Sequence, residues 1–454
     1  MELIQSIKEA GVVGAGGAGF PSHIKLNTTV ETLIVNGVEC EPLLETDKYY
    51  MRHFAEELIR SIEIVGTHLK ATRKIIGIKA KYKKEIQCLE HAIQKQNSKI
   101  EIKALESFYP AGDEQMLVKE ILNLSIPPGG IPLAVGAVVS NVATLLDIEK
   151  SIQNVPVTSR VITVTGAVKT PTLIKVPIGT SIKACLDLAG GVLPTLYAVI
   201  LGGPMMGADC NMAAIESTFV TKTLGGIIVL PEAHPIITSK RLSFKHIINR
   251  AASSCIQCRM CTDLCPRFLN GHPLWPHKVM RAIGNGEKSL EAYESALLCC
   301  ECGICELYAC PMGLSPKTVN QKVKQMLLSS GYKRKVTSES EPVITEAHDM
   351  RPYRKVYSNR LIARVALSEY AQIHLDDLVS YTPPQVTIGL KQHIGKPAIP
   401  CVKTGDVVEA GQCIADIEDG AMGARVHASI SGTVTVIENA VVITEGIQKE
   451  ARHD

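Results

Sequence analysis

The chain has little of what binding to nucleic acids would need. Its 454 residues include one Trp and six Phe, and they carry a formal net charge of +3. Such a small charge creates no strong field towards phosphate backbones, and few aromatic rings leave few surfaces on which bases could stack. The composition therefore gives no support to nucleic acid as a partner.

Long hydrophobic runs are also missing. Pro or Gly interrupts the most apolar stretches, Ile131–Val139 and Leu224–Leu230, and no run of 18 apolar residues occurs. We therefore expect no membrane span. The first ten residues carry three charges and lack the apolar segment of a leader, so we expect no secretory signal and a cytoplasmic protein. Leu3, Ile4 and Ile7 instead fit one face of a short helix, which packs on its own domain or docks on a partner.

Cysteine is abundant, with fifteen residues, and in a chain without a secretory signal this favours metal or redox chemistry over disulfides. Eight of them form two runs. These are Cys255-x2-Cys258-x2-Cys261-x3-Cys265-Pro266 and Cys299-x2-Cys302-x2-Cys305-x4-Cys310-Pro311. Three thiolates at this spacing can wrap a cubane cluster, and in two-cluster ferredoxins the following Cys-Pro reaches the other cluster. By that pattern one 4Fe–4S cluster is held by Cys255, Cys258, Cys261 and Cys310. The second is held by Cys299, Cys302, Cys305 and Cys265.

Two alternatives bear on this assignment. Zinc sites use pairs of C-x2-C knuckles and need only four ligands, whereas here two complete sets end in Cys-Pro, which favours iron–sulfur clusters. Cys300 is a spare thiol beside Cys299. A register that used Cys300 would break the two-residue spacing to Cys302, so we expect Cys299 to be the ligand.

A glycine-rich loop lies near the N-terminus. Gly14–Gly19 satisfies G-x-G-x-x-G, but a Rossmann site needs a strand directly before the loop and a helix directly after it. Only thirteen mostly helix-like residues precede the loop, and Phe20-Pro21 follows it. The Rossmann context is therefore absent. The loop is either a plain tight turn or an anion site in which backbone N–H groups and Lys25 face a phosphate.

Polar segments follow three predicted strands of an open α/β sheet, where ligands usually collect at the carboxyl ends of the strands. The strands and the segments after them are Leu33–Val35 with Asn36–Pro42, Ile100–Leu105 with Tyr109–Glu114, and Ala137–Val139 with Ser140–Thr144. We expect these segments to form a polar rim around one pocket.

These motifs carry a resemblance to known flavoproteins. Gly14–Lys25 resembles the flavin loop of the flavin-bearing component of complex I and of the RnfC component of Rnf complexes. Asn36–Pro42, Tyr109–Gln115 and Ser140–Thr144 resemble later segments of those families, in the same order. The resemblance implies an FMN phosphate bound by the loop residues Gly14, Gly16, Gly17, Gly19 and Lys25. Around the flavin it implies Asn36, Glu41, Tyr109, Gly112, Asp113, Asn141 and Thr144. Near NADH it implies Phe20 and the catalytic candidates Glu39 and Glu114.

The rest of the chain resembles two β modules of the same families. The predicted order is a hairpin of Val161–Gly166 with Leu173–Val176, a helix over Ser181–Ala189 and a strand at Val199–Leu201. This ββαβ order resembles the SLBB, or β-grasp, module. From Pro383 onward the chain resembles a barrel-sandwich hybrid of the biotinyl or lipoyl type. Gly423, not Lys, follows Ala421-Met422, so we expect no swinging-arm carrier.

The predicted fold is therefore a multidomain α/β and α+β protein. We expect an FMN/NADH-binding α/β domain over 1–155, an SLBB domain over 156–240 and a ferredoxin-like domain with two 4Fe–4S clusters over 241–332. A linker with a helical face at Leu361–Leu378 would occupy 333–382, and the hybrid 383–454. This domain order resembles the cobalamin reductases of propanediol-utilisation bacterial microcompartments, the PduS type.

That resemblance implies an NADH-dependent oxidoreductase with cobalamin as substrate, located in a bacterial microcompartment. Its partners would be a cobalamin adenosyltransferase or shell proteins, and a homo-oligomer is compatible with it. No cobalamin ligand follows from the sequence, because His374 and His393 fit structural or exposed positions better. Two alternatives stay open. One is a related electron-transfer flavoprotein for another reductase or a glycyl-radical microcompartment; the other is a non-catalytic redox adaptor of a membrane Rnf-like complex.

Overall fold

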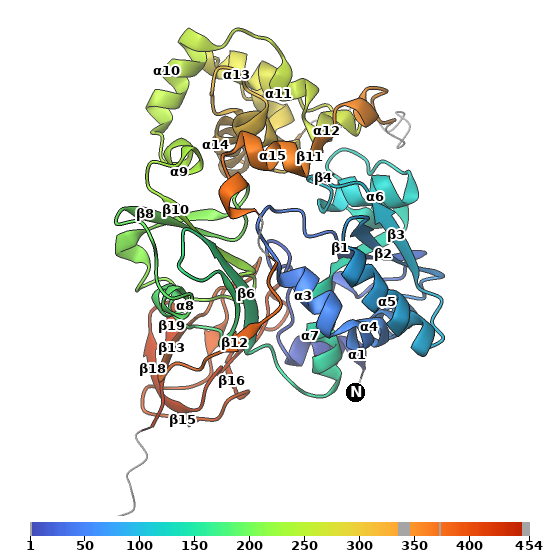
Figure 1. Cartoon of the computed structure of the whole chain (residues 1–454), viewed down its shortest axis with the longest axis vertical. Helices are drawn as coiled ribbons and strands as arrows, with labels where there is room; N and C mark the ends of the chain where they lie inside the picture. The colour runs from blue at the N-terminus through green and yellow to red at the C-terminus, as the bar shows by residue number, and fades with distance from the viewer. Residues whose placement is uncertain (1, 335–345, 372–373, 447–454) are drawn as a thin grey trace, which may run out of the picture.

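A computed structural model describes residues 2–334, 346–371 and 374–446. The predicted linker and the predicted C-terminal domain extend beyond this, because 335–345, 372–373 and 447–454 lie outside the described residues. Figure 1 shows four units: an N-terminal unit (3–152), a sheet unit (159–231), a cysteine unit (235–329) and a C-terminal unit (385–444). The cysteine unit lies at the top of this view, above both the N-terminal unit and the sheet unit.

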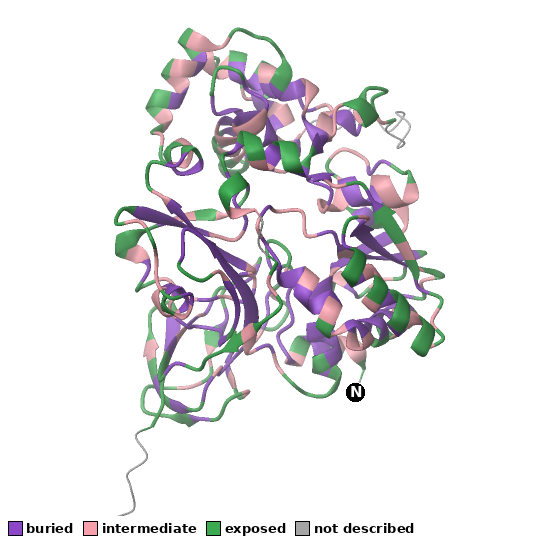
Figure 2. Cartoon of the chain, in the orientation of Figure 1, coloured by how far each residue is buried: buried purple, intermediate pink, exposed green. Residues whose placement is uncertain are grey.

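The N-terminal unit is a parallel four-stranded sheet with the strand order β3-β2-β1-β5. The strands are β1 (Thr32–Gly37), β2 (Arg73–Lys79), β3 (Glu101–Leu105) and β5 (Ala137–Asn141). The helices are α1 (Leu3–Glu9), α2 (Ser22–Lys25), α3 (Thr46–His53), α4 (Ala55–His68), α5 (Lys83–Lys95), α6 (Glu114–Leu122) and α7 (Val142–Ile152). The central strand β1 is buried almost throughout, as its apolar run Leu33–Val35 predicts for a parallel sheet covered on both faces. The edge strand β3 is mostly exposed (Figure 2).

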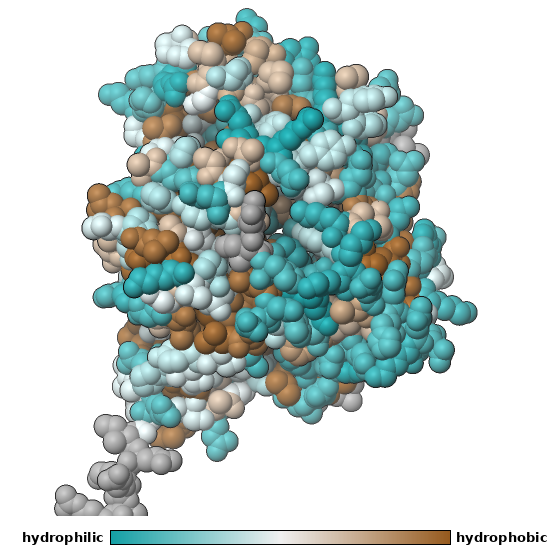
Figure 3. All heavy atoms as spheres, in the orientation of Figure 1, coloured by the Kyte–Doolittle hydropathy of each residue, from teal (hydrophilic) through white to brown (hydrophobic). Residues whose placement is uncertain are grey.

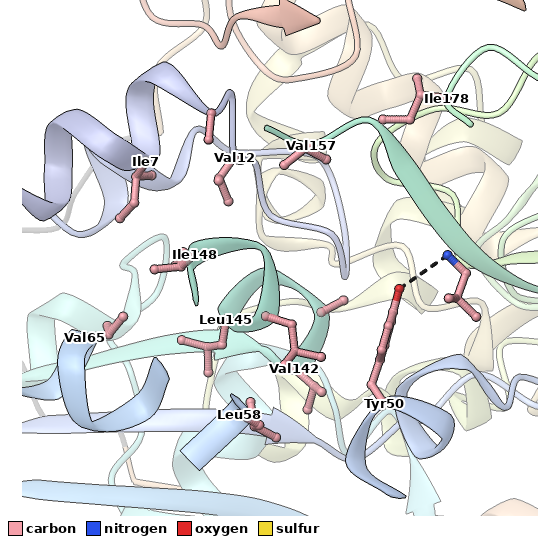
Figure 4. Packing of buried hydrophobic residues seen from close by; sticks show 14 of the residues in the cluster. Ile7, Val12, Tyr50, Leu58, Val65, Val142, Leu145, Ile148, Val157 and Ile178 are labelled. Atoms are coloured by element: carbon pink, nitrogen blue, oxygen red, sulfur yellow. Dashed lines mark hydrogen bonds between the residues drawn. The ribbon is translucent and has the colours of Figure 1, made fainter. Parts of the chain in front are cut away.

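The helix predicted at the N-terminus packs on its own unit. Ile7 of α1 is fully buried and belongs to one apolar core with Leu58 of α4 and Leu145 of α7 (Figure 4). The same view shows Tyr50 of α3, whose hydroxyl accepts a hydrogen bond from the backbone N–H of Val161 at 3.4 Å. The core therefore continues from the N-terminal unit into the sheet unit.

The sheet unit contains the predicted hairpin, helix and third strand. Its elements are β6 (Ser159–Gly166), β7 (Thr172–Pro177), α8 (Ile182–Leu188), β8 (Tyr197–Leu201), β9 (Ala208–Asn211) and β10 (Gly226–Pro231). β6 and β7 pair antiparallel, with Ile162 opposite Ile174. The strand order is β12-β7-β6-β10-β8-β9, so β12 (Leu378–Ser380), from much later in the chain, adds a parallel edge strand.

The helix expected over Leu361–Leu378 is a wrong prediction for most of that range. Helix α15 covers Ser358–Arg364, and Ala366 then adopts a left-handed backbone conformation with φ 57°, which an α-helix does not tolerate. A 3₁₀ turn at Ser368–Tyr370 follows, before the chain reaches β12. Helix periodicity alone did not reveal this break.

The cysteine unit consists of short helices around the two cysteine runs. They are α9 (Pro235–Lys240), α10 (Phe244–Ser254), α11 (Met260–Asp263), α12 (Pro266–Leu269), α13 (Pro276–Gly284), the 3₁₀ segment Leu290–Leu298, the π turn Ile304–Tyr308 and α14 (Pro316–Ser329). Pro opens α9, α12, α13 and α14, where its missing N–H costs no helical hydrogen bond. Strand β11 (Val356–Tyr357) then returns to pair with β4 (Phe108–Tyr109) of the N-terminal unit.

The C-terminal unit is built from two small sheets. One has the order β13-β19-β18-β15 and the other β14-β16-β17. The strands are β13 (Gln385–Gly389), β14 (Ile399–Pro400), β15 (Val407–Val408), β16 (Cys413–Asp416), β17 (Val426–His427), β18 (Gly432–Ile437) and β19 (Ala440–Thr444). Its core is continuous with that of the N-terminal unit. In the view of Figure 3 the surface over α4 and α5 is mostly hydrophilic.

Candidate functional site

The glycine loop is attached to the first turn of α7. The backbone N–H of Gly14 donates to the carbonyl of Phe20 at 2.9 Å, which closes the loop, and the N–H of Ala15 donates to Oγ1 of Thr144 at 2.9 Å. A side chain at Gly16 would meet the amide of Asn141 at 2.9 Å, whereas nothing lies within 4 Å of the position where Gly17 would carry one. The loop thus presents exposed backbone beside a helix N-terminus, the arrangement that binds phosphate groups.

Two of the predicted flavin residues stand at neighbouring strand ends. Asn36 of β1 lies directly opposite Asn141 of β5 in the parallel register. The amide of Asn36 donates to the carbonyl of Gly112 at 2.8 Å, which brings the third predicted segment to the same edge. Asn141 caps α7 by accepting from the N–H of Ala143 and donates to the carboxylate of Asp47 at 2.7 Å. The polar rim expected from the sequence is therefore present as a geometric arrangement.

Glu39 and Asp47 form a buried acidic pair beside this rim. The N–H of Asp47 donates to the carboxylate of Glu39 at 3.5 Å, and the carbonyl of Glu39 accepts from Lys79 at 3.0 Å. Burial, and then the charge of Asp47, raises the pKa of Glu39 above its usual range, and burial also raises the pKa of Asp47. The sequence did not single out Asp47, because an acidic residue in the first turn of a helix is usually a simple cap.

The remaining loop residues differ in their surroundings. Lys25 pairs with Glu114 at 2.5 Å, and both side chains are partly exposed. Phe20 is exposed at the mouth of the loop. Gly19, in contrast, is buried with φ 74°, and a side chain there would meet the backbone of Gln392 and His393 at 3.0 Å. Gly19 therefore packs against the C-terminal unit, while Gly16 and Gly17 stay open.

Glu41 and Tyr109 connect three units. The hydroxyl of Tyr109 lies 2.8 Å from the carbonyl oxygen of Cys302 and 3.1 Å from the carboxylate of Glu41. Glu41 also accepts from the backbone N–H of Met205 in the sheet unit at 2.9 Å. Burial raises the pKa of Glu41 against these hydrogen bonds. Two residues predicted around the flavin thus reach towards the cysteine unit.

Asp113 makes a second connection to the cysteine unit. One carboxylate oxygen caps α6 by accepting from Gln115 and Met116, and the other accepts from Arg267 at 2.8 Å. Arg267 was missed by the sequence analysis, although it directly follows Cys265-Pro266, and only its position after a predicted ligand could have drawn attention to it.

The first set of predicted cluster ligands comes together around Cys261. Burial, followed by the charges of Cys310, Cys255 and Cys258, raises the pKa of the Cys261 thiol to about 12. Cys310 comes from the second run, so the structure brings the exchanged fourth thiol next to the first three. Cys258 is exposed, while Cys261 and Cys310 are buried.

The second set surrounds a cavity of about 290 Å³. Its lining includes Cys265, Cys299, Cys300, Cys302, Cys305, Leu274, Pro276, Lys317 and Asn320. Burial and then the charges of Cys299 and Cys265 raise the pKa of Cys305 well above its usual range. Asn320 is fully buried, and neither atom of its side-chain amide has a hydrogen-bond partner within the described ranges. Four thiols and an unpaired amide around one cavity fit an anionic iron–sulfur cluster, whose sulfur atoms accept hydrogen bonds.

Cys300 lies beside this second set. A side-chain hydrogen bond with Cys302, helped by the charge of Arg267, holds the pKa of Cys300 below its usual range. The structure thus places the spare thiol at the same cavity as Cys299.

Neither histidine discussed from the sequence joins these sites. His374 is exposed near Lys84, and His393 is buried with its ring nitrogen 3.0 Å from the carbonyl of Lys396. Among the described residues, no three His, Cys, Asp or Glu side chains are placed to bind a single metal ion. In the same part of the chain, no helix has the length and hydrophobicity that crossing a bilayer requires.

Four domain families match the sequence in the order expected. Residues 7–150 match the Nuo51 FMN-binding domain, 161–209 the SLBB domain, 254–315 the 4Fe-4S dicluster domain and 371–450 the RnfC barrel sandwich hybrid domain. These matches confirm the predicted fold class and the predicted FMN and 4Fe–4S cofactors. The chain is an iron–sulfur flavoprotein oxidoreductase.

Curated relatives narrow this class. The chain is 40% identical to the cobalamin reductase PduS of Citrobacter freundii over 97% of its length and 96% of that protein. It is also 40% identical to the cobalamin reductase PduS of Salmonella typhimurium over 98% of its length and 97% of that protein. The chain belongs to the PduS family of cobalamin reductases, which confirms the resemblance seen in its motifs.

More distant relatives share part of the chain. The RnfC-type component of the proton-translocating ferredoxin:NAD+ oxidoreductase complex of Clostridium ljungdahlii is 34% identical over 59% of this chain and 56% of that protein. An NAD+-reducing NiFe hydrogenase in its H2-reduced state has a TM-score of 0.50 at 20% identity, covering 75% of this chain and 64% of that one. The hydrogenase likeness extends to the fold alone.

Proposed function

We propose that this chain reduces cob(III)alamin to its lower oxidation states with electrons from NADH. The observation that carries the proposal is the 40% identity, over nearly the whole length, to proteins named cobalamin reductase. The matches to FMN-binding and 4Fe-4S dicluster domains supply the cofactors that such a reaction needs. NADH delivers electrons in pairs and cobalt accepts them singly, and a flavin with iron–sulfur clusters supplies the conversion.

The FMN phosphate would lie against the backbone of Gly14, Gly16 and Gly17, with Lys25 nearby. The open space at Gly17 and the attachment of the loop to α7 support this position. Asn36, Gly112, Asn141 and Thr144 would surround the flavin, because all four meet at the carboxyl edge of the sheet. Phe20, Glu39 and Glu114 remain our candidates for the nicotinamide side.

Three residues of the same prediction take a modified role in the proposal. Glu41, Tyr109 and Asp113 would hold the flavin-binding unit on the cysteine unit, since each makes a contact that leads there. Gly19 would seat the loop on the C-terminal unit. These four residues would act on cofactor position and not as direct ligands.

The eight cysteines would hold two clusters in the exchanged pattern. One set is Cys255, Cys258, Cys261 and Cys310, and the other is Cys299, Cys302, Cys305 and Cys265. The thiol charges that act on Cys261 and on Cys305 support this division. Cys300 would stay a free thiol beside the second cluster.

The domain boundaries 1–155, 156–240, 241–332, 333–382 and 383–454 are part of the proposal, and the order of the strands and helices supports them. We further propose that the protein works in a propanediol-utilisation microcompartment with a cobalamin adenosyltransferase or shell proteins, as the family name suggests. Association with itself is part of the same proposal.

An anaerobic assay of the reconstituted protein tests the function. NADH and hydroxocobalamin should together give the visible spectrum of reduced corrin, and omission of NADH should abolish the change. Prompt reduction of an artificial dye without reduction of the corrin would refute the proposal and favour a related electron-transfer flavoprotein. Failure to bind FMN would favour a non-catalytic redox adaptor.

A further inference from the structure

Asn320 of α14 is a buried polar side chain that nothing in the described protein satisfies. It has no exposed surface, and both atoms of its amide lack a partner among the residues that the structure describes. Burying an amide without hydrogen bonds costs about 1–3 kcal/mol, so such groups persist when a bound group supplies the partner. Asn320 lines the cavity formed by Cys265, Cys299, Cys302 and Cys305.

Arg267 approaches the same thiols from another side. Its Nη2 is held by Asp113 at 2.8 Å, and Asp113 is itself fixed as the cap of α6. Nε and Nη1 of Arg267 are buried and have no hydrogen-bond partner within the described part of the chain. The thiols of Cys300 and Cys302 lie within electrostatic reach of the guanidinium.

The two side chains therefore offer unused N–H donors to one cavity. A 4Fe–4S cluster with four thiolate ligands is anionic, and its sulfides and thiolates accept hydrogen bonds. Donors and positive charge near such a cluster stabilise the reduced form more than the oxidised form, because reduction adds negative charge. Asp113 partly cancels the charge of Arg267.

We propose that Asn320 and Arg267 donate hydrogen bonds to the sulfur atoms of the cluster held by Cys265, Cys299, Cys302 and Cys305, and thereby raise its reduction potential. The proposal rests on the ligand assignment in the proposed function. Asn320 and Arg267 are positioning residues, and Asp113 sets how much of the arginine charge the cluster experiences.

The test is a reductive titration of reconstituted protein followed by EPR, with iron and FMN measured for each variant. Asn320→Leu and Arg267→Gln should each lower the potential of one cluster signal, with about a tenfold change in its reduction equilibrium, or about 59 mV for one electron. Asp113→Asn should shift the same signal in the opposite direction. Asn249→Leu, at an exposed position of α10 in the same unit, is the matched control and should change neither signal.

Opposite shifts in one signal, with the other signal unchanged, would support the proposal. Unchanged potentials in Asn320→Leu and Asp113→Asn at full iron content would overturn it. If a variant loses iron, Asp113→Asn decides alone, because it preserves the size and the cap of the side chain. A parent that reduces no corrin but shows two cluster signals would contradict the proposed function and leave this test intact, whereas a parent without two signals would overturn both.

Discussion

The hydroxyl of Tyr109 lies 2.8 Å from the carbonyl oxygen of Cys302, across the boundary between the N-terminal unit and the cysteine unit. Tyr109 is 1% exposed, and the same hydroxyl contacts Glu41. A buried hydrogen bond between the segment after the flavin strands and a predicted cluster ligand fixes the distance between the two cofactor sites. Together with the ion pair of Asp113 and Arg267, it makes this boundary a defined interface and not a flexible joint.

Removing the Tyr109 hydroxyl should weaken this interface. Tyr109→Phe leaves the carbonyl of Cys302 and one oxygen of Glu41 without their donor, and we expect a loss of about 1–3 kcal/mol in stability. Thermal unfolding of the reconstituted protein measures the loss as a lower unfolding temperature. Tyr353→Phe is the control, because Tyr353 is 81% exposed and should tolerate the change. Equal unfolding temperatures for both variants would show that the bond contributes nothing.

Replacing one ligand of each cluster should remove that cluster alone. Cys258→Ser and Cys302→Ser are each expected to lose about half of the bound iron and one of the two EPR signals, because each cubane needs four thiolates. Iron analysis and EPR check both outcomes. Cys300→Ser and the distant, exposed Cys401→Ser should keep all iron. Full iron in Cys258→Ser or Cys302→Ser would refute the ligand assignment.

Filling the open side of the glycine loop should prevent flavin binding. Gly17→Val puts a branched side chain where the phosphate would approach the backbone, so we expect at least about tenfold weaker FMN binding with both clusters retained. Flavin fluorescence and iron content report the two effects separately. Gly446→Val, also without neighbours within 4 Å, is the control. Normal FMN binding by Gly17→Val would argue that the phosphate lies elsewhere.

The acidic pair should make stability depend on pH. Burial and the neighbouring Asp47 raise the pKa of Glu39 above its unfolded value, so the folded state holds a proton that the unfolded state releases. Its contribution to stability is complete below the ordinary carboxyl pKa and is lost as pH rises through the raised value. Glu39→Gln should therefore gain stability relative to the parent as pH increases. Unfolding measured at several pH values tests this, and a constant difference between the two proteins would contradict it.

Local spacing in the sequence was enough to predict much of the architecture. The eight cysteines, the glycine loop and the polar segments after three strands are short motifs, and each predicts its chemistry without knowledge of the fold. The parallel register that places Asn36 opposite Asn141 follows from the expectation that strand ends share one edge.

Contacts between distant segments were out of reach of such reasoning. The pairing of β12 with β7, the packing of Gly19 on the C-terminal unit and the orphan donors of Asn320 and Arg267 join residues far apart in the chain. A single Asn in a helix or an Arg after Cys-Pro carries no local signal of burial. Glu41 illustrates the same limit, since its direction depends on Met205 and Tyr109 and not on its own neighbours.

The central claim is that electrons pass from the flavin to the acceptor through the clusters. The most direct test compares the parent with Cys302→Ser in anaerobic assays that use NADH as donor and either an artificial dye or hydroxocobalamin as acceptor. We predict that Cys302→Ser keeps its FMN and reduces the dye but no longer reduces hydroxocobalamin, while the parent reduces both. Reduction of hydroxocobalamin at the parental rate by Cys302→Ser that lacks the second cluster would contradict the account.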